Sequence, residues 1–182
     1  MAYFEWDDSY SVGVASLDAQ HKELIRLINR LNDFEQHGGD LTGVLNRLDW
    51  YVHHHFSFEE SLLAAVRYDG LEAHIAEHRE FERWLRGSRR AVHAGGAEAR
   101  DIGRIINDYL KDWLREHILV VDMDYKAILT AAANRRASLK VLADELVEAL
   151  AEVEANPSTE TIGRAKSLAS DIKLCCDLAG DA

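Results

Sequence analysis

Proline is almost absent from this chain of 182 residues, in which Pro157 is the single one. Because proline and glycine are the main breakers of helices, the long stretches between the few glycines can form uninterrupted helices. Cysteine is nearly absent too, with only Cys175 and Cys176. Two neighbouring cysteines cannot build a disulfide framework, so we expect reduced helix residues, with a vicinal disulfide or thiol switch as the alternative.

Positive charge and long apolar runs are also lacking. The formal net charge is -11 at pH 7, and no basic run could neutralise phosphates. This charge argues against nucleic acid and against an anionic membrane surface as partners. The first residues, MAYFEWDDSYSVGV, do not join a basic region to an apolar stretch, and no window is apolar enough to span a bilayer. We therefore expect a cytoplasmic protein.

Apolar residues recur at alternating steps of three and four in four successive blocks, which is the period of amphipathic helices. Four such helices with short loops predict an all-α, up-down-up-down four-helix bundle. An aromatic N-terminal arm, residues 3–10, is expected to pack on the bundle as a lid, and Ser16 is a candidate N-cap for the first helix. Two further apolar stripes on either side of Pro157 predict a C-terminal helical hairpin. We therefore expect a bundle domain, residues 1–130, and a hairpin extension, residues 131–182.

Histidine interrupts the apolar seam, the row of core-facing residues, in every block. Within the run of three histidines, only His55 falls in the seam at 100° per residue, so His53 and His54 should face solvent. Glu59 follows one turn later in the same seam, whereas its neighbour Glu60 should point outward or to a helix boundary. The polar seam residues of all four helices are His21, His55, Glu59, His74, His78 and His117.

These six residues should meet at one end of the bundle, because the start of one antiparallel helix lies level with the end of the next. A single histidine on an apolar face is more often a satisfied core residue than a ligand. Several unpaired polar groups in one apolar layer, however, would cost about 1–3 kcal/mol each. A metal would supply the common partner. Five histidines and one carboxylate are more protein ligands than one metal ion usually binds. They therefore predict two ions bridged by carboxylates.

A second bridging carboxylate is expected from Asp122, with Asp124 as its rival. Asp122 follows His117 by five residues, so the two side chains differ by about 140° around an ideal helix and cannot point along one radius. They could instead flank a site that lies between two ions. We would then expect the helix to be locally loosened at this point.

The spaced residues resemble the pattern of the hemerythrin family, in particular its bacterial type. The resemblance rests on HFSFE (55–59), HIAEH (74–78), WLREH (113–117) with the following Asp122, and on VGV (12–14) and DAQH (18–21) near the start. It extends over roughly residues 4–129 and implies a non-haem centre of two iron ions. By this resemblance, one iron takes His74, His78 and His117, the other takes His21 and His55, and Glu59 and Asp122 bridge them. Dioxygen would bind at the open position of the less-coordinated iron.

Apolar side chains are expected to wall that open position, namely Leu24, Trp113, Leu114 and Ile118. Such a pocket suits a small apolar gas and slows protonation and loss of the bound oxygen species. The predicted function is therefore reversible dioxygen binding, for transport, storage or sensing, by a binding protein and not an enzyme.

Other functions remain as alternatives. A di-iron oxidase or peroxidase is disfavoured, because ferritin-like enzymes use Glu-rich sites, whereas this chain offers five imidazoles and two carboxylates. Zinc-dependent hydrolysis is disfavoured because the pocket lacks a spare base. A third alternative is a helical interaction module in signalling, in which the metal is only structural.

The two stripes of the hairpin bury too little against each other to stand alone. They are Leu139, Leu142, Leu146, Leu150 and Val153 in one helix, and Ile162, Ala165, Leu168, Ile172 and Cys175 in the other. Either the outside of the bundle or a second chain must cover them. Because the outer faces of the bundle are rich in charge, we expect a homodimer through the hairpin.

Overall fold

The computed structural model describes residues 3–38, 40–94 and 99–180, and all regular structure within them is helical, which confirms the all-α class. Its elements are η1 (Asp8–Tyr10), α1 (Ala15–His37), α2 (Leu41–Ala65), α3 (Leu71–Ala94), α4 (Ala99–Glu116), η2 (His117–Asp122), α5 (Met123–Ala155) and α6 (Thr159–Gly180). The chain forms two compact units, Met1–Leu129 and Thr130–Ala182. The side chain of Cys175 lies outside the described residues.

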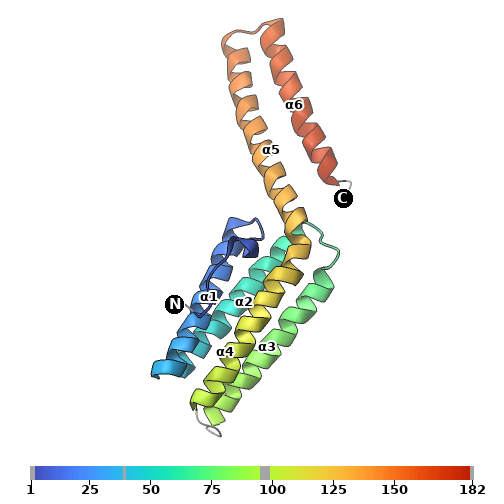
Figure 1. The fold of residues 1–182 in the computed structure, drawn as a ribbon. Coiled ribbons are helices and arrows are strands. Elements are labelled where there is room, and N and C mark those ends of the chain that lie inside the picture. The colour runs from blue at the N-terminus through green and yellow to red at the C-terminus, as the bar shows by residue number, and fades with distance from the viewer. Residues whose placement is uncertain (1–2, 39, 95–98, 181–182) are drawn as a thin grey trace. The chain divides into compact units, whose positions relative to one another are not determined.

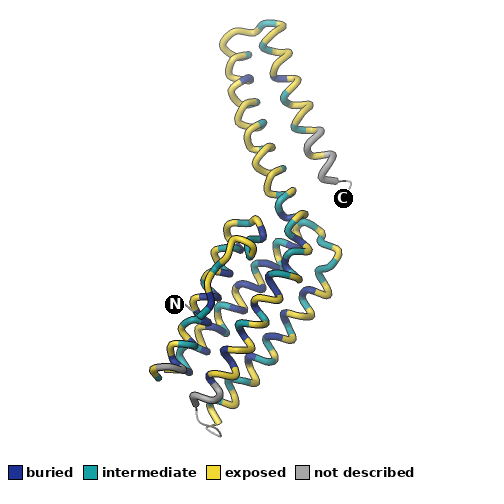
Figure 2. Tube along the Cα trace, viewed as in Figure 1, coloured by how far each residue is buried: buried dark blue, intermediate teal, exposed yellow. Residues whose placement is uncertain are grey.

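The first unit is an up-down-up-down bundle of α1 to α4 (Figure 1). In it α1 packs against α2 and α4, and α3 packs against the same two helices. The apolar seams face one another, so the buried positions line the inside of the bundle (Figure 2). None of the described helices is both long and apolar enough to cross a membrane.

The buried apolar residues of this unit form two clusters. The larger cluster includes Leu24, Phe81 and Leu114, and the smaller one includes Leu17 and Leu63. Along α1, the polar residue at position 21 lies between Leu17 of the smaller cluster and Leu24 of the larger one. The polar seam residues thus form a layer with apolar side chains both above and below it.

The N-terminal arm is fastened to the bundle by side-chain hydrogen bonds. The amide of Asn29 bonds to the backbone of Phe4 in both directions, each at 2.8 Å. The expected N-cap at Ser16 is wrong, because α1 begins at Ala15 and Ser16 lies inside its first turn. Asp18 ties the arm down instead, since its carboxylate accepts bonds from the backbone N–H of Val12 (2.9 Å) and from a serine hydroxyl (2.6 Å). The arm also reaches η2, which it contacts through η1.

Between α4 and α5 the chain winds as a π-helix over six residues, from His117 to Asp122. A π-helix contains one more residue per hydrogen-bonded turn than an α-helix and is frequent at functional sites. This finding confirms the local loosening that the five-residue step predicted.

The second unit is a hairpin formed by the later part of α5 and by α6. Ala149 and Ala165 are buried in it, whereas Leu150 is 50% exposed and Ile162 is 39% exposed. The expected stripe through Leu150 is therefore wrong at that position. From Leu146, a step of three residues to Ala149 and a step of four residues to Leu150 both fit the helical period. In the structure it is the small Ala149 that is buried. Cys176 is a free thiol and is exposed.

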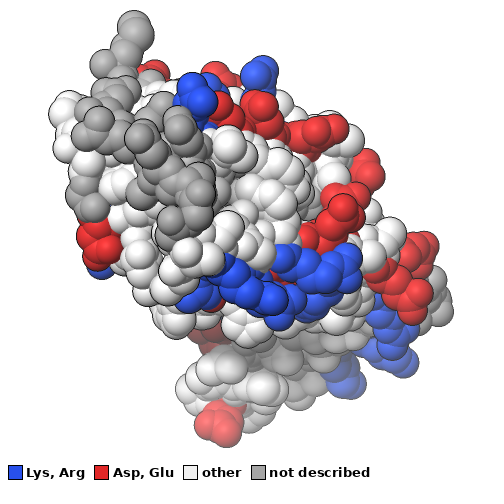
Figure 3. Space-filling model, turned by 90° about the horizontal axis from the view of Figure 1, so that it is seen from below, with Lys and Arg blue, Asp and Glu red and all other residues white. Residues whose placement is uncertain are grey.

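The charges of the bundle are unevenly distributed. Arg86, Arg89, Arg90 and His93 line a surface hollow near the end of α3. Lys and Arg side chains also form a band on the face of the molecule shown in Figure 3. The hollow begins eight residues after His78, about 12 Å along α3. This positively charged hollow therefore lies away from the polar layer.

Candidate metal centre

Seven side chains meet in one layer of the bundle, which we call the polar layer. α1 supplies His21, α2 supplies His55 and Glu59, α3 supplies His74 and His78, and η2 supplies His117 and Asp122. None of the seven is more than 3% exposed. The structure thus brings all seven candidate ligands together. The rival carboxylate, Asp124, is exposed and lies outside the layer.

The two carboxylates lie between imidazoles from different helices. The Oε1 atom of Glu59 is 3.4 Å from Nε2 of His74, and its Oε2 atom is 3.5 Å from Nε2 of His55. For Asp122, Oδ2 is 3.4 Å from Nε2 of His21, and Oδ1 is 3.2 Å from Nε2 of His117. Oε2 of Glu59 is also 3.6 Å from Nε2 of His78. Each carboxylate therefore lies near imidazoles of at least two helices, where it could bridge two ions.

The spacing of the donor atoms fits metal coordination. Two ligand atoms about 2.1 Å from one ion and at right angles lie about 3 Å apart. The Nε2 atoms of His78 and His117 are 3.1 Å apart. One potential ligand atom from each of Glu59, His74, His78 and His117 lies within 4.8 Å of the others. This group can hold a single metal ion.

Many polar atoms of the layer have no hydrogen-bond partner although they are fully buried. They include both ring nitrogens of His21 and His74, both carboxylate oxygens of Asp122 and Oε2 of Glu59. Leaving such groups unpaired costs about 1–3 kcal/mol each, so a purely structural polar cluster would be strongly destabilising. A cation would satisfy one nitrogen of each imidazole and the carboxylate oxygens, because each of these atoms offers a lone pair. The residues present therefore fit a metal centre.

The electrostatics of the layer favour the metal-binding forms of its groups. Burial lowers the pKa of His21 and of His117 to about 3 and the pKa of His78 to about 2. These imidazoles are therefore neutral at pH 7 and keep a lone pair for a metal. Burial tends to raise the pKa of Glu59, but His74, whose Nε2 atom is 3.4 Å from Oε1, and the other nearby histidines outweigh it and lower that pKa. Burial and the charge of Glu59 raise the pKa of Asp122, so bound cations would stabilise its ionised form.

Hydrogen bonds from outside the layer orient two of the imidazoles, and a carboxylate lies near a third. Nδ1 of His55 lies 2.9 Å from Oε1 of Gln20, and Nδ1 of His78 lies 2.9 Å from Oε1 of Glu60. Because both partner oxygens are acceptors, these Nδ1 atoms carry the proton and Nε2 is left free for a metal. For His117, the Nδ1 atom lies 3.5 Å from Oε2 of Glu77.

Of the two directions expected for Glu60, outward is wrong, because Glu60 faces the boundary between α2 and α3. Its carboxylate is half-buried, bonds to His78 and also accepts a hydrogen bond of 2.7 Å from Arg79. The signal for such partners is present in the sequence, because Gln20, Glu60 and Glu77 are each next in the chain to a residue of the polar layer. At 100° per residue, such a neighbour lies on the flank of its helix and faces the adjacent helix.

Tyr125 was not identified from the sequence. It is fully buried, and its hydroxyl donates a hydrogen bond to Oε1 of Glu59. Burial and the two carboxylates raise the pKa of this phenol far above its usual value, so it remains a donor. Tyr125 therefore fixes one oxygen of a candidate bridging group. It follows Asp122 by three residues, one helical turn, which is the spacing that could have indicated it.

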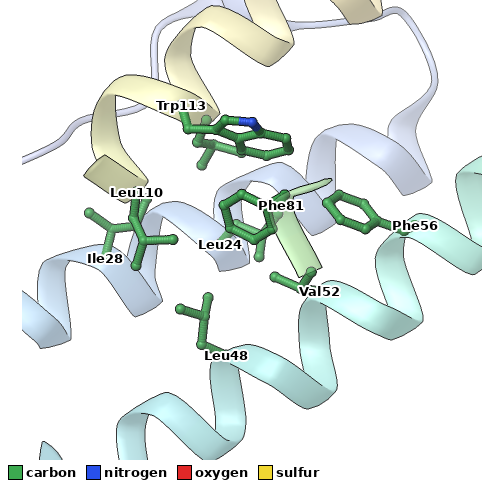
Figure 4. A pocket seen from close by; sticks show the side chains of 9 residues that line it. Leu24, Ile28, Leu48, Val52, Phe56, Phe81, Leu110 and Trp113 are labelled. Carbon is green, nitrogen blue, oxygen red and sulfur yellow. The ribbon is translucent and has the colours of Figure 1, made fainter. Parts of the chain in front are cut away.

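An apolar cavity of about 10 Å³, whose lining side chains are shown in Figure 4, lies beside the polar layer. Four of its wall residues are each three positions, about 4.5 Å along the axis, from a polar-layer histidine on their own helix. They are Leu24 on α1, Val52 on α2, Phe81 on α3 and Leu114 on α4. Trp113 also lines the cavity, whereas Ile118 is fully buried nearby without lining it. The volume is enough for about one water-sized molecule.

His53 and His54 are exposed, as their positions outside the seam predicted. Nδ1 of His53 is 3.4 Å from Oε1 of Glu82, and the ring of His54 stacks on Trp50 with centroids 5.5 Å apart. Neither histidine takes part in the polar layer.

Comparison with known proteins agrees with this geometry. The family described as the hemerythrin HHE cation binding domain matches residues 12–129. The chain is 32% identical to the bacteriohemerythrin of Pseudomonas aeruginosa over 127 residues, which are 69% of this chain and 80% of that protein. It is 34% identical to the hemerythrin of Siphonosoma cumanense over 126 residues, 69% of this chain and 94% of the relative.

A solved structure gives the same result for the fold. The crystal structure of a wild-type hemerythrin matches with a TM-score of 0.63 and 31% identity, over 71% of this chain and 99% of the other. The family match and the curated relatives cover the bundle that holds the polar layer, and the buried cluster of histidines and glutamate suits a non-haem di-iron site. This chain belongs to the hemerythrin family.

Proposed function

We propose that the chain binds dioxygen reversibly at a non-haem di-iron centre formed by the polar layer. His74, His78 and His117 would hold one iron, His21 and His55 the other, and Glu59 and Asp122 would bridge them. When bound, the two irons supply the electrons with which dioxygen is held. The observation that carries the proposal is an apolar cavity one helical turn from a layer of neutral imidazoles.

The chain's own residues favour release of dioxygen over its further reduction. The indole nitrogen of Trp113 is the one polar side-chain atom of the nine residues that line the described cavity. Further reduction of dioxygen consumes protons, and these walls hold no acid that could deliver them. The cavity is also too small for an organic substrate, and its walls offer a water molecule only one polar partner. This is why we favour a carrier, store or sensor over an oxidase or peroxidase.

The positions of the imidazoles are held by their outer partners. Gln20 and Glu60 bond to Nδ1 of His55 and of His78, and Tyr125 bonds to Glu59. Such partners keep ligands oriented when a small molecule binds and leaves. The centre is therefore preorganised for repeated binding.

Iron analysis and visible spectroscopy test the proposal. The purified protein should hold about two irons per chain. After reduction without air, it should gain a visible absorption band on exposure to dioxygen and lose the band when dioxygen is removed. The same protein loaded with zinc is the control and should show no band. A spectrum that changes once in air and never reverses would favour the oxidase, and a protein that takes up only zinc would overturn the proposal.

A further inference from the structure

A surface groove runs between α3 and α4 beside the polar layer. Its volume is about 430 Å³, and we call it the α3–α4 groove. On α3 it is lined by Glu77 and Glu80, and on α4 by Tyr109, Trp113 and Glu116. Residues three or four apart lie on one face of a helix, so the spacing of these positions turns each set toward the groove.

The groove is acidic. It contains three carboxylates, and no Lys or Arg is among its lining residues. Glu80 and Glu116 are exposed, and the side chain of Glu77 is 49% exposed. Carboxylate oxygens that converge from two helices are ligands for hydrated divalent cations.

A buried imidazole also reaches this groove. His117 is one of the lining residues although it is only 3% exposed, and its Nδ1 atom is buried without a hydrogen-bond partner. Oε2 of Glu77, at 3.5 Å, is the nearby carboxylate oxygen on the groove side. On its other side, the same ring presents Nε2 to His78 at 3.1 Å and to Asp122 at 3.2 Å. His117 therefore connects the groove with the interior of the polar layer.

The polar layer needs such a connection, because its seven residues are at most 3% exposed and a metal ion must still reach them. His117 is the first residue of the π-helix η2, where the regular α-helical hydrogen bonding is interrupted. Positive charge, in contrast, gathers farther along α3, around Arg86 and Arg90. An approaching cation is thus attracted by the three carboxylates of the groove and repelled by the arginines of the hollow.

We propose that the α3–α4 groove is a divalent-metal entry site, in which Glu77, Glu80 and Glu116 bind hydrated Fe²⁺ before it passes His117 into the polar layer. This inference rests on the proposed function, because it presumes that the polar layer is filled with iron. It assigns to the three glutamates a role in the rate of loading and not in the final metal content.

The first test measures iron uptake by metal-free protein in the absence of air. The variant E80Q/E116Q leaves the contact of Glu77 with His117 intact, and it should load about tenfold more slowly at low ionic strength. It should still reach the same final iron content as the wild type. The difference should shrink as salt is added, because salt screens exposed charges. The variant D33N/E72Q is the matched control. It removes two exposed carboxylates outside the groove and should load at the wild-type rate.

The second test detects the entry site directly and does not depend on iron. With the polar layer filled by zinc, Tb³⁺ in the groove should emit when the rings of Tyr109 and Trp113 are excited, since both line the groove. E80Q/E116Q should lose most of this emission, and D33N/E72Q should keep it.

The outcomes separate the two proposals. If E80Q/E116Q takes up iron as fast as the wild type, or if its Tb³⁺ emission is unchanged, the entry site is refuted while the di-iron centre stands. If the wild type takes up no iron, both proposals fail.

Discussion

The three consecutive histidines of α2 have different environments although they are neighbours in the chain. His55 is buried, and its Nε2 atom lies 3.5 Å from Glu59, whereas His53 and His54 are exposed. We therefore expect His55→Ala to lose iron and the dioxygen-dependent absorption, because it removes one of the two imidazoles that we propose for its iron. His53→Ala and His54→Ala should keep about two irons per chain and the absorption band. Iron analysis and visible spectroscopy of the three variants check this.

A different result for His54→Ala would contradict this prediction. If His54→Ala were as damaging as His55→Ala, the stacking of His54 on Trp50 would matter for the centre, or the assignment of ligands on α2 would be wrong.

The buried histidines also predict how the metal-free protein responds to acid. Burial lowers the pKa of His21, His78 and His117 to about 3, 2 and 3, and it lowers the pKa of His55 too. In the unfolded chain these groups titrate near 6.5. Below that pH the unfolded state binds more protons than the folded state, so the free energy of unfolding falls as the pH falls. Asp122 and Glu60, whose pKa values are raised, act in the opposite direction, but the four histidines and Glu59, whose pKa is lowered, outnumber them.

We therefore expect the melting temperature of metal-free protein to decrease as the pH is lowered from about 6.5 toward 3. The metal-loaded protein should change less near the top of this range, because bound metal keeps the imidazoles deprotonated. Thermal melting followed by circular dichroism checks both. Equal melting temperatures of the metal-free protein at pH 7 and pH 5 would contradict the expectation.

At the scale of residues, the sequence predicted the seam positions because burial follows the helical period. His21, His55 and Glu59 could be placed in this way, since each helix turns by a fixed angle per residue. Glu60 could not, because its direction depends on Arg79 and His78 of a neighbouring helix. A period within one helix contains no information about which residues the next helix presents.

At the scale of elements, η2 resolves the geometric conflict between His117 and Asp122. In a regular α-helix their five-residue step would separate them by about 140°. In the π-helix both are buried, and Nε2 of His117 lies 3.2 Å from Oδ1 of Asp122. The sequence offered a reason to expect local loosening here, because two candidate ligands were out of phase, but it did not require it. It could not indicate that the loosening takes the form of one complete π-turn.

Deletion of Val120 tests the need for this turn. Val120 is 58% exposed, so its loss removes little packing, and a shortened segment can wind as a regular α-helix. We expect the metal-free variant to be at least as stable as the wild type, since the unusual turn is gone. Iron binding should fall below two per chain, because His117 and Asp122 would then point along nearly one radius. Chemical denaturation and iron analysis measure the two effects.

Val120→Ala is the matched control for this deletion. It keeps the number of residues between His117 and Asp122, and it should bind iron as the wild type does. If the deletion variant bound two irons as tightly as Val120→Ala, the π-turn would not be required for the centre.

At the scale of the whole molecule, the hairpin is the part whose own packing leaves several apolar side chains exposed. Ala149 and Ala165 are buried, yet Val141, Val147 and Leu150 are each at least 50% exposed. Two helices alone bury too little apolar surface to be stable, so a further surface should cover these residues. Charge indicates a second copy of the chain. The later part of α5 begins with Arg135, Arg136 and Lys140 and continues with Glu145, Glu148, Glu152 and Glu154.

Two α5 helices that cross in opposite directions about a two-fold axis would place the basic part of each beside the acidic part of the other. We therefore expect the full-length chain to be a dimer in solution. The substitutions V147E/L150E should make it monomeric, because each would bury two unpaired carboxylates in the contact. Ile105→Glu, at a position of the bundle that is 64% exposed, is the matched control and should remain dimeric. Sedimentation and iron analysis of all three check the expectation, with about two irons per chain in each. A full-length monomer would refute the dimer, and loss of iron from V147E/L150E would show that the hairpin supports the bundle directly.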